Sequence, residues 1–273
     1  MLRRAGLITL LLLSCASRAD VVLLSGVRSA VLDELVSVLS EHVDVPVRRA
    51  LSGERPGPSD VVILAGDEAI SSWSGQQKSI AIWSRREVIE ARLGHISSAL
   101  YTEPPLVRQL ALAQTLFPDA RVSVLFSENA PLWLRNEIYA LPEQDVSRVQ
   151  MSSEYGLNYA LRDALADSDV LLGVSDSVVY SPATIKNILI SAYRQNIPLV
   201  GPHQAYIRAG AIATTYSSLA DTALRLAEMI SAEELPEPGV NPYFSVLFNE
   251  QVARSLNISL PENTPELLKR INR

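Results

Sequence analysis

Polar side chains that follow short apolar segments are the groups of this chain that could do chemistry. Asp176 stands out because it follows the apolar segment 169–174 and precedes a helical pattern. In open parallel α/β sheets, such loops lie at the carboxyl ends of the strands, where ligands bind. A carboxylate there could accept a hydrogen bond from a ligand ammonium group, or it could cap the turn that follows. Both interpretations of Asp176 stay open.

The same rule selects further loop residues as ligand-binding candidates. Serines could donate hydrogen bonds to a ligand carboxylate or bond only to their own backbone. Aromatic rings could stack on a ligand or pack between helix and sheet, and glycines suit tight turns whatever the ligand. With Asp176, the predicted ligand contacts are Ser25, Gly26, Gly66, Trp83, Ser84, Ser127, Ser177, His203 and Tyr206.

The sequence carries no pattern typical of a catalytic or metal site. His42, His95 and His203 are not paired at a zinc-binding spacing, and His203 alone follows a strand end. A nucleophile elbow, a phosphate loop and a dinucleotide fingerprint are all missing from the sequence. Asp167 and Asp169 flank a strand start, away from where general acid–base catalysis would be placed. We therefore expect a protein that is not an enzyme and has no cofactor and no metal.

Short apolar runs alternate with helical patterns along the chain. Several runs are apolar throughout, as strands of a parallel sheet covered on both faces require. The predicted strands are residues 21–25, 45–50, 60–65, 79–83, 121–126, 146–151, 169–174, 197–200, 211–215 and 244–248. Helical stripes cover 31–39, 106–117, 185–192 and 219–230, and cap signals occur at Ser181 before Pro182, at Asn249, and at Thr264 before Pro265.

Ten strands are more than we expect in a single sheet, so the predicted fold class is α/β with two doubly wound parallel sheets. The alternation of strands and helices is interrupted at 101–105, which is the predicted boundary between two lobes. A second candidate linker lies at 233–242.

The first 19 residues have the pattern of an export signal. Arg3 and Arg4 precede the uncharged stretch 5–14, and Ser17 and Ala19 fit the −3 and −1 positions of a cleavage site. The stretch is shorter than the roughly 20 apolar residues of a membrane span.

Cys15 leaves a second possibility open, because the segment 12–15 also resembles a bacterial lipoprotein box. The mature protein is then either free in the periplasm or anchored through a lipid on Cys15. Removal of residues 1–19 takes three of the 24 Lys and Arg, which leaves 21 against 30 acidic residues and a net charge of −9. Such a charge argues against a nucleic-acid partner.

Several segments of the second half carry a further signal. They are SDS at 175–177, SPATIKNIL at 181–189, IPLVG at 197–201, AYIRAGA at 205–211 and FSVLFN at 244–249. Together they resemble the ABC-transporter substrate-binding family related to tryptophan/tyrosine-binding proteins. The resemblance is clearest over residues 160–260 and weaker over 20–125, where only Ile96 of the segment 95–100 fits closely.

This resemblance implies a type I periplasmic binding protein fold, in which two hinged lobes joined by three crossovers close on a ligand. It implies that lobe one comprises residues 20–104 and 209–236, and that lobe two comprises 105–208 and 237–273. It also implies a periplasmic receptor of an ABC importer, with an inner-membrane permease as partner and an amino acid or similar small polar solute as ligand. The alternative is an envelope accessory protein on the same fold, with a degenerate ligand site.

Overall fold

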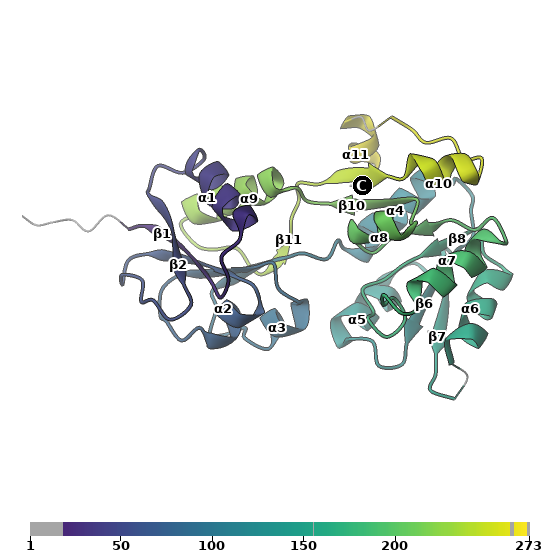
Figure 1. Cartoon of the computed structure of the whole chain (residues 1–273), viewed down its shortest axis with the longest axis horizontal. Coiled ribbons are helices and arrows are strands. Elements are labelled where there is room, and N and C mark those ends of the chain that lie inside the picture. Colours follow the sequence, from purple (N-terminus) through teal and green to yellow (C-terminus); the bar gives the residue numbers. More distant parts are fainter. Residues whose placement is uncertain (1–18, 155, 263–264, 272–273) are drawn as a thin grey trace, which may run out of the picture.

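The computed structural model describes residues 19–154, 156–262 and 265–271, and this part of the chain forms two lobes (Figure 1). Lobe one is built on a six-stranded sheet with the order β11-β5-β4-β3-β1-β2. Its pairings are all parallel. The strands are β1 (Val21–Ser25), β2 (Val47–Leu51), β3 (Val61–Ala65), β4 (Ser79–Ile82), β5 (Ser98–Tyr101) and β11 (Gly239–Val240).

Lobe two is built on a second six-stranded sheet of the described residues, with the order β12-β10-β9-β8-β6-β7. Only β12 is antiparallel to its neighbour, β10. The strands are β6 (Val122–Ser127), β7 (Val146–Met151), β8 (Val170–Leu172), β9 (Leu199–Val200), β10 (Ala213–Tyr216) and β12 (Ser245–Phe248).

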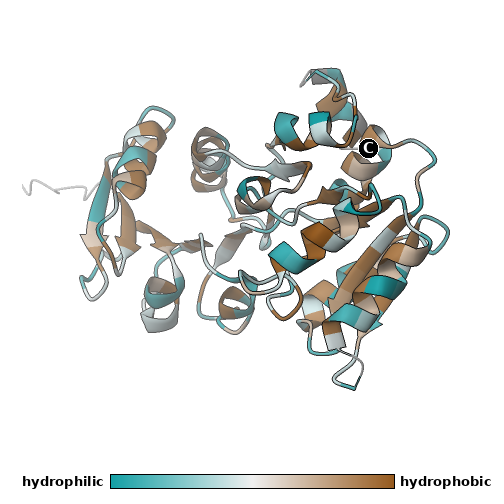
Figure 2. Cartoon of the chain, turned by 45° about the vertical axis from the view of Figure 1, so that its right-hand side comes forward, coloured by the Kyte–Doolittle hydropathy of each residue, from teal (hydrophilic) through white to brown (hydrophobic). Residues whose placement is uncertain are grey.

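Helices cover both sheets, with the apolar residues drawn in brown concentrated along the strands (Figure 2). Lobe one has α1 (Ala30–Ser40), α2 (Asp67–Ser72), α3 (Arg86–Glu90) and α9 (Leu219–Ser231). Lobe two has α4 (Leu106–Leu116), α5 (Leu132–Ala140), α6 (Gly156–Ala166), α7 (Ile185–Tyr193), α8 (Ala205–Ala209), α10 (Glu250–Ser255) and α11 (Pro265–Ile271).

Strand β1 shows why the buried strands are apolar throughout. Val21 and Leu23 belong to the core under α1 and α9, whereas Val22 and Leu24 belong to the core on the other face of the sheet. Successive side chains of a strand point to opposite faces, so a strand covered on both faces has no polar side. The prediction of a parallel, doubly covered sheet is confirmed.

Each of the ten predicted strand segments overlaps a strand, but two further strands were missed. Strand β5 is short and contains small residues, and β11 has two residues in a stretch rich in Pro and Gly. The cap at Asn249 is confirmed, because its Oδ1 accepts a 3.1 Å hydrogen bond from the Val252 N–H. The cap at Ser181 is wrong: residues 181–184 form turns, and α7 begins at Ile185 after Thr184. The cap at Thr264 lies outside the described residues.

Residues 1–18, which include most of the predicted export signal and Cys15, lie outside the described residues. Within the described ranges, no helix is both long and apolar enough to cross a membrane.

Three segments of the described chain run between the lobes: 102–105 after β5, 217–218 after β10, and 241–244 after β11. This number agrees with the expected three crossovers. The strand pairing differs from the expected boundaries at 209 and 236, because β10 pairs within the second sheet and β11 pairs with β5 in the first. Figure 1 shows α9 beside α1 in lobe one. The chain therefore crosses back from lobe two to lobe one between β10 and α9.

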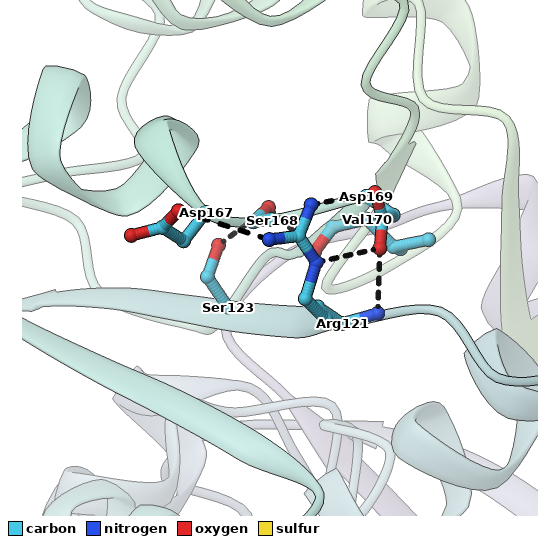
Figure 3. Close-up of polar contacts among 6 residues, drawn as sticks. All are labelled: Arg121, Ser123, Asp167, Ser168, Asp169 and Val170. Carbon is cyan, nitrogen blue, oxygen red and sulfur yellow. Dashed lines mark hydrogen bonds and ion pairs between the residues drawn. The ribbon is translucent and has the colours of Figure 1, made fainter.

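The amino ends of β6 and β8 are joined at the edge of lobe two opposite to the strands' carboxyl ends (Figure 3). Arg121 donates hydrogen bonds of 3.0 and 3.1 Å to the two carboxylate oxygens of Asp169, and its Nη1 lies 3.7 Å from Asp167. These two aspartates therefore hold a strand start. In the part of the chain that the structure describes, no group of His, Cys, Asp and Glu could hold a metal ion.

Candidate ligand-binding cleft

A cavity of about 760 Å³ lies between the two lobes. Its wall comes from the ends of β4 and β5 and the residues after them in lobe one, from the loops after β6, β8 and β9 and the start of α5 in lobe two, and from all three crossovers. A smaller cavity of about 530 Å³ lies within lobe one alone, between the segments 52–58 and 69–77. The first cavity has the size and position expected of a small-molecule site between domains.

Six of the ten predicted contacts line this cleft: Trp83, Ser84, Asp176, Ser177, His203 and Tyr206. The other four, Ser25, Gly26, Gly66 and Ser127, are not among the lining residues. Their roles in ligand binding stay predictions.

In lobe one, the point between β1 and β3 where the strand order reverses is already filled. Ser25 is fully buried and its Oγ donates a 2.5 Å hydrogen bond to the Val27 carbonyl. A Cβ on Gly26 would lie 2.0 Å from Glu68 Oε2, so the Glu68 side chain covers this glycine. The cleft consequently begins two strands further along the sheet, at the ends of β4 and β5.

Asp176 lies at the corresponding reversal of lobe two, between β6 and β8, and it is 1 % exposed. Its carboxylate accepts hydrogen bonds from the backbone N–H groups of Ser127 at 2.6 Å, Val178 at 2.9 Å and Val179 at 3.4 Å. A carboxylate with three backbone donors stabilises its own turn and ties that turn to β6. The turn-capping interpretation of Asp176 therefore has direct geometric support.

Trp83 has an unusual backbone conformation at the end of β4. Its φ of 51° is left-handed, a region where bulky residues are rare and which is often used at ligand sites. The partly buried ring packs against the core of lobe one and also lines the cleft. Packing and ligand contact are thus compatible for this side chain.

Ser84 has its hydroxyl engaged within lobe one. It is 5 % exposed and donates to Asp67 Oδ1, while the Arg85 Nε donates to the other oxygen of Asp67 at 2.9 Å. The hydrogen bond from Ser84, with those from Arg85, lowers the pKa of Asp67. Asp67 in this way neutralises Arg85, a cation of the cleft wall.

Tyr206 holds two loops of lobe two together. Its hydroxyl donates a 2.6 Å hydrogen bond to the Tyr180 carbonyl, and its ring meets the His203 ring edge-on at 4.6 Å. Desolvation lowers the pKa of His203 below its usual value, because burial favours the neutral imidazole.

The cleft residues that the sequence analysis missed include two groups. One is Tyr101 at the end of β5 with Glu103 in the first crossover, and the other is Trp133 on α5 with Glu87 on α3. The interruption of the strand–helix alternation at 101–105 could have predicted the first group, because segments that cross between the lobes border the space between them. No sequence signal could have paired α3 with α5.

A contact between α3 and α5 joins the lobes at one side of the cleft. Arg86 donates to Glu137 across the lobes at 2.6 Å and to Glu90 on its own helix at 2.9 Å. The Trp133 Nε1 of lobe two donates a 2.9 Å hydrogen bond to Glu87 of lobe one. The Arg86 guanidinium also lies 4.6 Å from the Trp133 ring centroid.

Replacing Arg86 with alanine is expected to weaken this contact by about 1–3 kcal/mol, because the charged hydrogen bond to Glu137 and the ring contact are lost. The population should shift toward more open lobes, seen as a larger radius of gyration in small-angle X-ray scattering. Arg254→Ala is the matched control, since its ion pair with Glu250 lies within α10. An unchanged radius for Arg86→Ala would contradict the interpretation.

Comparisons with known proteins agree with this architecture. No family model matches the chain, and no curated protein matches its sequence. A ligand-free, open substrate-binding protein with adhesive properties from Clostridium difficile superposes with a TM-score of 0.68 at 12% identity, covering 90% of this chain and 97% of that one.

Two other solved structures are similar over almost their whole length. A conserved domain protein from Vibrio cholerae has a TM-score of 0.56 at 16% identity, covering 92% of this chain and 98% of that one. An ABC domain in complex with L-Trp from Streptococcus pneumoniae has a TM-score of 0.54 at 14% identity, covering 93% and 98%. At such identities the likeness shows the fold, and the chain has the two-lobed α/β fold of the type I periplasmic substrate-binding proteins.

Proposed function

We propose that this protein is the substrate-binding component of an ABC import system and captures a small polar solute between its lobes. An amino acid or a similar metabolite is the expected ligand, and an inner-membrane permease is the expected partner. The protein is expected in the periplasm after removal of residues 1–19, or anchored there through Cys15, and it is expected to catalyse no reaction.

The observation that carries this proposal is the cavity of about 760 Å³ bounded by both lobes and by the three crossovers. A ligand that touches both lobes favours the closed arrangement by its differential affinity for that arrangement. The solved neighbours support the same role: one is a substrate-binding protein and another is in complex with L-Trp.

A thermal-shift screen against amino acids, amines, sugars and organic acids tests the proposal. A true ligand at about one hundred times its Kd should stabilise the folded protein by about 2.7 kcal/mol. Asn129 is an exposed residue of the cleft wall, so Asn129→Trp should fill the cavity and abolish the shift. Asn136→Trp, at an exposed position of α5 outside the wall, is the control. Absence of any stabilising compound would refute the receptor role.

An accessory interaction protein on the same fold is the second candidate. It is favoured by the filled strand reversal at Gly26 and by the backbone-saturated carboxylate of Asp176. The Clostridium difficile neighbour, a substrate-binding protein with adhesive properties, combines both kinds of role. Recovery of a stable protein partner by a variant with a blocked cleft would favour this alternative.

A further inference from the structure

Apart from Asp176, whose carboxylate accepts from backbone N–H groups, the cleft wall contains two carboxylates for which the described residues provide no ion pair: Glu103 and Glu87. Glu103 lies in the first crossover, between β5 and α4, and Glu87 lies on α3 of lobe one. The ion pairs near them use other acids, since Arg85 binds Asp67 and Arg86 binds Glu90 and Glu137. The cleft therefore has an excess of negative charge at this end.

Glu103 is the more confined of the two. Its Oε2 is buried and accepts no hydrogen bond from the described part of the chain. Desolvation raises the pKa of Glu103, and the nearby charge of Glu87 raises that pKa further. Backbone hydrogen bonds at Glu103 and Arg86, and then the charge of the Arg86 guanidinium, act in the opposite direction on this pKa. The guanidinium is already held by two carboxylates and lies 4.3 Å from the Tyr101 ring centroid. A partly buried carboxylate with one unpartnered oxygen, whose neighbouring guanidinium is shared with two other acids, would be stabilised by a further cation.

The remaining ionisable groups of the wall do not supply that cation. Arg85 is neutralised by Asp67, and desolvation keeps the pKa of His203 below its usual value. Asp176, which the sequence suggested as an ammonium acceptor, is occupied by backbone N–H groups. The Trp83 and Tyr216 rings, which also line the cleft, can favour a cation through their faces.

We propose that the acidic end of the cleft formed by Glu103 and Glu87 receives the positively charged nitrogen of the solute. The ligand class is then small compounds with an ammonium group, which are amines and amino acids. This inference rests on the proposed receptor function and deepens it, because it places the charged contact in lobe one and the crossover.

Matched sets of compounds test the charge requirement. Isothermal titration with tryptamine, L-tryptophan and indole-3-propionate compares one indole body with and without an ammonium group, and aliphatic and phenolic sets of the same design extend the comparison. The compounds with an ammonium group should bind, and the corresponding acids should not. In Glu103→Gln, Kd for the binders should rise at least about tenfold, a loss of about 1.4 kcal/mol.

Two further variants separate this effect from a general loss of folding. Glu87→Gln should weaken the same compounds to a smaller extent, since Glu87 is exposed and already accepts from Trp133. Glu143→Gln, at an exposed position after α5, should leave Kd unchanged. Binding of organic acids, with no loss in Glu103→Gln, would overturn the inference but keep the receptor role. Binding of no compound at all would overturn both.

The free protein gives an independent readout. Because the folded-state pKa of Glu103 is raised, the wild type should lose stability relative to Glu103→Gln as pH rises through that pKa. Glu103→Gln should thus melt at a higher temperature than the wild type at about pH 8 and at a similar temperature at about pH 4. If the difference in melting temperature between the two proteins does not change with pH, Glu103 already has a counter-charge in the free protein, and the inference is overturned.

Discussion

Replacing Gln109 with leucine is expected to lower the free energy of unfolding by about 3–5 kcal/mol. Gln109 is a fully buried residue of α4. Its Nε2 donates to the Gly201 carbonyl at 2.7 Å and to Thr214 Oγ1 at 2.9 Å. Its Oε1 accepts from the Thr215 N–H at 3.0 Å and from the Thr215 hydroxyl at 2.9 Å.

The physical reason is that leucine would fill the space but leave the Thr215 N–H and hydroxyl buried without an acceptor, each at a cost of about 1–3 kcal/mol. The Gly201 carbonyl would keep the hydrogen bond that it accepts from the Thr214 hydroxyl. Thr215 lines the cleft, so the same amide also positions part of the ligand site. Urea unfolding followed by circular dichroism measures the change. The exposed Gln144, changed to leucine, is the control and should stay within about 0.5 kcal/mol of the wild type. A similarly small effect at Gln109 would show that water or neighbouring groups replace its hydrogen bonds.

Replacing Asp176 with alanine is expected to cost about 3 kcal/mol of stability. The three backbone N–H groups that donate hydrogen bonds to its buried carboxylate would lose a charged acceptor. A hydrogen bond to a charged group contributes about 1.5–3 kcal/mol, and the contributions of neighbouring bonds are not additive. Asp176→Asn keeps one acceptor oxygen and should lose about half as much. Thermal and urea unfolding of the free protein measure both losses.

This experiment also decides between the two interpretations of Asp176. The exposed Asp44, changed to alanine, is the control for loss of a surface carboxylate. If Asp176→Ala unfolds like the wild type and yet no longer binds an ammonium compound, Asp176 is the ligand contact and its turn is held by other groups.

The sequence predicted the elements well where a strand is covered on both faces. The segment 21–25 coincides with β1, because burial on each face selects apolar residues at successive positions. Shorter strands were missed, since β11 has two residues and its place depends on pairing with β5 rather than on its own composition. The resemblance had placed residues 209–236 in lobe one, whereas β10 pairs with β9 and β12 in the sheet of lobe two.

The site was predicted in part, and the failures have a common cause. The rule that ligands bind beyond strand ends selected Trp83, Ser84, Ser177, His203 and Tyr206, all of which line the cleft. The rule could not tell that Glu68 fills the space over Gly26, or that Ser25 turns its hydroxyl to its own backbone. Both facts depend on which side chain from another element reaches the loop.

By itself, the sequence determined the alternation of apolar strands and amphipathic helices, and with it two parallel sheets. These are local properties, because each strand or helix must bury its own apolar residues wherever it lies. The tertiary structure alone decided which strand ends border the gap, which carboxylates there have a counter-charge, and how Arg86 and Glu137 meet across the lobes. Those features depend on distances between residues far apart in the chain, and such distances are set only when the two lobes pack.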